Sequence, residues 1–166
     1  MKQFKLFLWI AGLLFLQTAL SVFFNYSGIL PDLLFAFSIA YAAYERSLKP
    51  VMWVTVICGV ITCACGADEF VFVMIIFAAG AALTYMSYDA PHRMAGAARA
   101  LTGALLFTAA GSLVTYMLTT LSFDLTYFLY HIIPVTVLNA LCSVLIYAGL
   151  TKCFEIKDTA KKLIIS

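Results

Sequence analysis

The chain has 166 residues, of which 64% are hydrophobic and only 11% are charged, and its formal net charge is +2. So few polar residues cannot cover the outside of a water-soluble domain of this length, whereas a lipid bilayer accepts an apolar exterior. The basic residues are scattered and form no stripe, which excludes a nucleic-acid-binding surface. We therefore predict an all-α integral membrane protein with a single transmembrane domain over residues 1–166.

Charged residues divide the chain into uncharged runs, and each run predicts one transmembrane helix. The predicted helices cover residues 6–25, 30–45, 50–67, 69–88, 98–122 and 126–151. The second run, 33–44, is short, because a span requires roughly 17 to 25 residues. Counting it as a crossing nevertheless places all ten Lys and Arg residues on one side of the membrane, which is the positive-inside distribution. This pattern predicts six crossings, with both termini in the cytoplasm.

The start of the second helix carries two residues that suit a helix beginning near the outer membrane surface. Pro31 suits the first helical position, because its missing N–H is not needed there. Asp32 suits the positive end of the helix dipole. We expect both residues to lie in the outer headgroup region.

Polar side chains inside the predicted membrane helices are the next signal. Gln17 in the first helix and Asn139 in the last must find hydrogen-bond partners, because an unpaired amide in hydrocarbon is costly. Contacts between helices of this chain would satisfy them, and so would a ligand or a partner. Pro134 lacks an amide hydrogen and leaves the carbonyl of Tyr130 without its helical donor, which predicts a kink in the last helix.

The fifth predicted helix carries a stripe of small residues that would let another helix approach closely. Two interpretations stay open: packing within the chain, and docking of a partner helix or a second copy of the chain. Ala78, Gly80 and Ala82 of the fourth helix form a similar, shorter surface. The stripe consists of Gly96, Ala100, Ala104, Thr108 and Ser112, with Gly103 and Gly111 on a neighbouring line.

Residues that could carry chemistry do not combine into a site. Cys63 and Cys65 are two positions apart, so they point to different faces of a helix, and no histidine is near them in sequence. His92 and His131 are predicted on opposite sides of the membrane, and neither is paired with a nucleophile. We therefore predict no enzyme activity, no metal site and no cofactor.

Both ends of the chain resemble the rod shape-determining protein MreD family, small bacterial membrane proteins encoded with the cell-elongation machinery. The first likeness is Gln17 in helix one, a short outer turn, and Pro31-Asp32 followed by two leucines. The second is the last helix, where Pro134 and Asn139 match the family's proline and asparagine. The middle departs from the family pattern, because the aspartate often found inside the third helix is missing and acids appear only at Asp68 and Glu69.

The resemblance implies a non-enzymatic scaffold in the bacterial cytoplasmic membrane, part of the elongation complex (the elongasome) that maintains cell shape. Its implied partners are an MreC-like single-helix membrane protein and the peptidoglycan synthases of that complex. The small-residue stripe adds a second copy of the chain as a further candidate partner, and the lipid bilayer surrounds the protein. The implied fold is similar to that of the substrate-binding subunits of energy-coupling-factor vitamin transporters, and that function stays open as an alternative. It requires a cavity near the outer leaflet, for which Gln17, Asp32, Tyr127 and His131 are the candidate lining residues.

Overall fold

The computed structural model describes residues 2–24, 29–65, 70–87, 96–120 and 124–163, and this part of the chain is all-α, as predicted. It contains six helical segments in chain order, the last of which joins two α-helices through a π-helical turn, η2. They are α1 (Lys2–Phe24), α2 (Leu33–Tyr44), α3 (Leu48–Ala64), α4 (Phe70–Met86), α5 (Gly96–Thr120), and α6 (Leu125–Tyr127) with η2 (Phe128–Ile132) and α7 (Ile133–Leu163). The predicted helix ends at residues 25, 67, 69, 88 and 122 lie outside the described residues, as do Asp68, Glu69 and His92.

Three helices are long and apolar enough to cross a membrane, which indicates a multi-pass membrane protein. Their apolar spans are Gln3–Val22, Gly96–Met117 and Leu125–Phe154. The helices α2, α3 and α4 are shorter apolar helices. The last helix continues beyond the predicted end at residue 151 to Leu163, because the Lys, Glu and Ala residues that follow are good helix formers.

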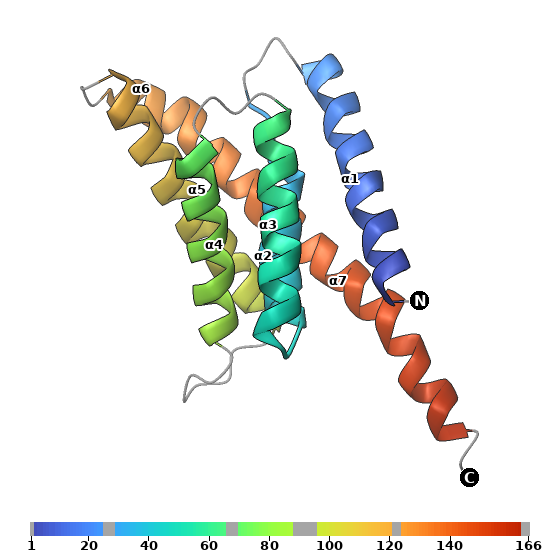
Figure 1. Cartoon of the computed structure of the whole chain (residues 1–166). Coiled ribbons are helices and arrows are strands. Elements are labelled where there is room, and N and C mark those ends of the chain that lie inside the picture. Colours follow the sequence, from blue (N-terminus) through green and yellow to red (C-terminus); the bar gives the residue numbers. More distant parts are fainter. Residues whose placement is uncertain (1, 25–28, 66–69, 88–95, 121–123, 164–166) are drawn as a thin grey trace.

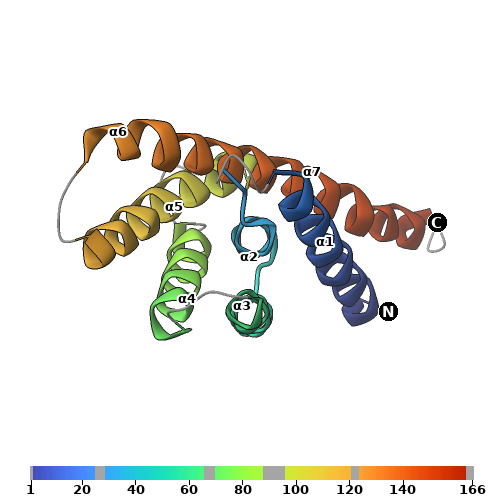
Figure 2. The ribbon, with the colours of Figure 1, turned by 90° about the horizontal axis from the view of Figure 1, so that it is seen from above.

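The short helix α2 is the centre of the fold. Viewed from above, it lies in the middle, with α1, α3, α4, α5 and α7 around it (Figure 2), and it packs against all five. Every residue of α2 except Tyr44 is buried. This helix is apolar all round, as expected for a helix that has neighbours on every side.

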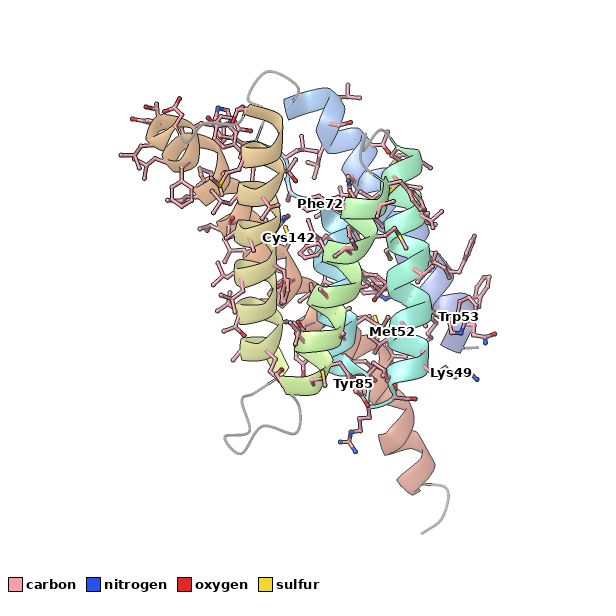
Figure 3. The ribbon with its side chains drawn as sticks, turned by 60° about the vertical axis from the view of Figure 1, so that its left-hand side comes forward. Lys49, Met52, Trp53, Phe72, Tyr85 and Cys142 are labelled. Atoms are coloured by element: carbon pink, nitrogen blue, oxygen red, sulfur yellow. The ribbon has the colours of Figure 1, made fainter. Side chains whose placement is uncertain are left out.

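The long last helix crosses the bundle diagonally, and the first residues of α1 lie toward the same end of the bundle as the last residues of α7 (Figure 1). The side chain of Lys5 joins the two helices by donating to the carbonyl oxygen of Cys153 at 3.1 Å. The hydroxyl of Tyr85, at the end of α4, donates to the carbonyl of Arg46 in the turn between α2 and α3 at 3.2 Å (Figure 3). These bonds connect helix ends on the outside of the bundle.

The helix α2 begins later in the chain than predicted, because a capping residue precedes it. Pro31 does not occupy the first helical position, because the helix begins at Leu33 and Asp32 is its N-cap in an extended conformation. One carboxylate oxygen of Asp32 accepts a hydrogen bond from the backbone N–H of Phe35 at 3.0 Å. An aspartate cap of this kind fixes the helix start, so Pro31 lies just outside it.

The last helix continues past Pro134, but its hydrogen-bond pattern changes just before this residue. The π-helical turn η2 comes directly before α7, in which Pro134 is the second residue. A proline cannot donate to the carbonyl four residues earlier, and a π-helical turn is one way in which a helix continues past such a defect. The predicted kink therefore takes the form of this turn, which also contains His131.

Much of the small-residue stripe of α5 packs against other helices of the chain. Ala100 and Ala104 are fully buried, and the hydroxyl of Ser143 on α7 donates to the carbonyl of Ala100 at 3.0 Å. A Cβ atom added at Gly103 would collide with Thr84 of α4, and one added at Gly111 would lie 2.9 Å from the side chain of Ile76. These contacts favour the first interpretation for this part of the stripe, and docking of a partner helix or a second copy stays a prediction.

The glycines give a direct test of this packing. We expect Gly103→Ala to destabilise the protein by about 1–3 kcal/mol, because the new methyl group must displace the buried Thr84. Gly12→Ala is the matched control, since nothing lies within 4 Å of the corresponding Cβ position. Reversible unfolding in mixed micelles measures both variants, and equal stability of the two would contradict the packing described here.

Candidate functional site

The amino end of α2 is held by side chains from both ends of the sequence. The oxygen Oε1 of Gln17 on α1 accepts hydrogen bonds from the backbone N–H groups of Leu33 at 3.1 Å and Leu34 at 3.4 Å. The oxygen Oδ1 of Asn139 on α7 accepts from the backbone N–H of Asp32 at 2.7 Å. Together with the Asp32 cap, these two amides satisfy the donors that any helix leaves open at its start.

Asn139 also ties a third helix to this point. Its amide nitrogen Nδ2 donates to the hydroxyl oxygen of Thr108 on α5 at 3.3 Å, and both residues are buried. A single side chain thereby connects α2, α5 and α7. The predicted need of Gln17 and Asn139 for partners is met by the backbone of α2 and by one hydroxyl.

The carboxyl end of α2 receives a charged donor. The guanidinium of Arg99 on α5 is buried, and its Nη2 donates to the carbonyl oxygen of Ala43 at 2.8 Å. A cation in the last turn of a helix satisfies an open carbonyl and is favoured by the helix dipole. From the sequence, Arg99 was predicted only to lie with the other basic residues on the cytoplasmic side. The available signal was its place among Gly and Ala residues in the first turn of α5.

A cavity of about 420 Å³ lies beside the amino end of α2. Its apolar wall includes Phe35 of α2, Phe77 of α4 and Phe107 of α5. Its polar lining comes from the N-cap of α2 and from α3, α5, α6, η2 and α7, and includes hydroxyl, amide, imidazole and carboxylate groups. The polar lining residues are Asp32, Thr62, Thr108, Ser112, Thr115, Tyr116, Tyr127, His131 and Asn139.

Three aromatic rings stack along this lining. The rings of Tyr116 on α5 and Tyr127 on α6 lie 4.3 Å apart with an interplanar angle of 12°. The rings of Tyr127 and His131 lie 4.7 Å apart with an angle of 22°. The sequence singled out Tyr127 and His131, which are four positions apart on one helical segment, but it missed Tyr116, which tertiary packing of another helix brings to them.

The structure sorts the predicted residues into three groups. Asp32, Tyr127 and His131 line the cavity that the ligand-binding alternative requires, whereas Gln17 is not among its described lining residues and binds the backbone of α2. The upper part of the α5 stripe, from Thr108 through Gly111 to Ser112, also lines the cavity. The lower part, Ala100 and Ala104, is buried within the bundle, and Pro134 shapes the last helix.

The five cysteines and His131 form no metal-binding cluster with other described residues, and His92 lies outside the described residues. All five cysteines are free thiols. Within the described ranges, no group of three or more His, Cys, Asp or Glu side chains is placed to hold a metal ion. The polar groups around the amino end of α2 are therefore the candidate functional site in the part of the chain that the structure describes.

Comparisons with protein-family models, with curated proteins and with solved structures find no match to this chain. Function is therefore inferred from the chain's own sequence and geometry.

Substitutions at two residues of the network at the start of α2 should lower the stability of the protein by unequal amounts. Asn139→Leu should cost about 1–3 kcal/mol, because it leaves the buried N–H of Asp32 without an acceptor. Thr108→Val is the control, because it removes only the hydroxyl that Asn139 donates to and leaves the bond to Asp32 in place. Unfolding in mixed micelles compares the two variants. A loss for Asn139→Leu no larger than that for Thr108→Val would rule out the capping role.

Proposed function

We propose that this chain is a non-enzymatic membrane scaffold of the MreD type, which acts in the bacterial cell-elongation complex of the cytoplasmic membrane. In this role it binds an MreC-like single-helix membrane protein and supports the peptidoglycan synthases that maintain rod shape. The supporting observation is that Gln17, Asp32 and Asn139, which carry the resemblance to that family, meet at the amino end of α2. Two distant stretches of sequence thus serve one structural element, which gives the resemblance a physical basis.

A scaffold needs an outer face that a partner helix can approach, and α1 offers one. The described glycines other than Gly12 all face side chains of neighbouring helices, including Gly103 and Gly111 of the α5 stripe. Gly12 alone has open space at its Cβ position. It lies on the exposed face of α1 beside Leu8 and Phe15, at the edge of the bundle (Figure 2). A glycine on an outer face permits the close backbone approach by which membrane helices associate.

The scaffold proposal predicts what accompanies the protein from its own host. Mild-detergent affinity purification with mass spectrometry should recover a single-helix periplasmic partner together with wall synthases. Gly12→Leu should reduce recovery of the partner several-fold, because the leucine side chain keeps the two backbones apart. Ala110→Leu is the matched control, since Ala110 is an exposed small residue on α5. Equal recovery with both variants would remove α1 as the docking face, and a wild-type protein without these partners would overturn the scaffold.

A second candidate function is favoured by the cavity. A substrate-binding subunit of an energy-coupling-factor vitamin transporter requires a ligand site, and Asp32, Tyr127 and His131 line such a cavity here. Its volume of about 420 Å³ falls within the usual size of small-molecule sites, roughly 300–1,000 Å³.

The two candidates respond differently to vitamins. A transporter subunit should be stabilised by its vitamin, by about 2.7 kcal/mol at a concentration 100 times the dissociation constant. It should also co-purify with an ATPase pair. Thermal unfolding of the purified chain with a panel of vitamins measures the first effect, and a scaffold should show no shift with any of them.

A further inference from the structure

The cavity beside α2 has a single formal charge among its described lining residues. Asp32 is the only Asp, Glu, Lys or Arg side chain there. One of its carboxylate oxygens accepts from the N–H of Phe35, and the amino end of α2 offsets part of the negative charge. A carboxylate in a largely apolar cavity still produces a negative potential, because low-dielectric walls focus the field. An anionic ligand would meet no Lys or Arg side chain among these residues.

The aromatic lining is a second feature of the cavity that attracts positive charge. The stacked rings of Tyr116, Tyr127 and His131 line the cavity, and the two tyrosines bring electron-rich rings and hydroxyl oxygens that suit a cation. The hydroxyl groups of Ser112 and Thr115 supply further oxygen atoms along α5. Oxygen acceptors, one carboxylate and aromatic rings together match an ammonium group better than any neutral or anionic group.

We propose that this cavity binds a small ammonium compound. The ammonium group lies next to Asp32 and the aromatic stack, and the apolar part of the ligand contacts Phe77 and Phe107. A free amine and the ammonium headgroup of a membrane lipid share this chemistry. The proposal concerns the cavity that favours the second candidate function, but it requires no ATPase partner. It can therefore fail while either proposed function stands, and it can hold while either fails.

Three compounds of nearly the same shape test the charge. Choline carries a quaternary ammonium group, 3,3-dimethylbutan-1-ol replaces the nitrogen by carbon, and 3,3-dimethylbutanoate is an anion. Binding to the full chain in phosphatidylglycerol nanodiscs is measured by calorimetry, with empty nanodiscs as background. Choline should bind at least several-fold more tightly than the neutral alcohol, and the anion should not bind. Equal binding of choline and the alcohol, or no binding of choline, would overturn the proposal.

Two matched variants assign the effect to Asp32. Asp32→Asn removes the charge and keeps a good N-cap residue, so the helix start is preserved. It should weaken choline binding roughly tenfold and leave binding of the neutral alcohol unchanged. Asp124→Asn removes an equivalent carboxylate that caps α6 but does not line the cavity, and it should change neither affinity. A similar loss in both variants would show a general surface effect and contradict the site.

A third variant and a change of lipid complete the test. Ser112→Phe fills the cavity from α5 and should abolish choline binding while the thermal midpoint stays close to that of the wild type. Binding that survives in this well-folded variant would place choline elsewhere. Nanodiscs that contain phosphatidylethanolamine distinguish the two sources of the ammonium group. Weaker choline binding there, in the wild type but not in Asp32→Asn, identifies the lipid headgroup, and unchanged binding identifies a free amine.

Discussion

A helix buried on all sides in a membrane protein must have both of its ends satisfied by protein, and this constraint organises the fold. The twelve residues of α2 rise only about 18 Å, whereas the hydrocarbon core is about 30 Å thick, so this helix is shorter than a usual span. Amides left open at its ends would be costly inside a membrane protein. Gln17, Asn139 and Arg99 therefore bring α1, α7 and α5 to the two ends of α2.

The short length of α2 also explains the cavity. The space beyond the amino end of α2 is bounded by α4, α5 and the last helix, and polar groups that cap α2 line it. The π-helical turn before Pro134 contains His131, whose ring stacks on Tyr127 at this wall. A ligand that occupied the cavity would contact Asp32 and Asn139, so it would stabilise the bonds that hold α2, α5 and α7 together.

The sequence predicted the positions of the helices well, but it did not predict which helices pack against one another. Charged residues between apolar runs located six helical segments, because a membrane helix must be both long and uncharged. The central place of α2 was not visible, since an apolar surface suits lipid and protein equally. For the same reason the sequence left open what the α5 stripe packs against, whereas the structure places side chains of α4 against Gly103 and Gly111. The pairing of Tyr116 with Tyr127 and the contact of Arg99 with Ala43 depend on tertiary packing that one sequence does not encode locally.

The two faces of α1 have different neighbours: the inner face contacts the bundle, and the outer face is the proposed docking face for a partner helix. Its inner face, formed by Leu6, Ile10, Leu13 and Gln17, packs toward the bundle and reaches the amino end of α2. Its outer face carries Gly12 and Phe15 and is exposed. Positions 12 and 17 differ by about 140° around a helix with 3.6 residues per turn, so a partner on Gly12 would not obstruct Gln17. A partner that tilted or shifted α1 would nevertheless move Gln17 against Leu33 and Leu34. The proposed docking face would therefore be linked to the start of α2 through two hydrogen bonds.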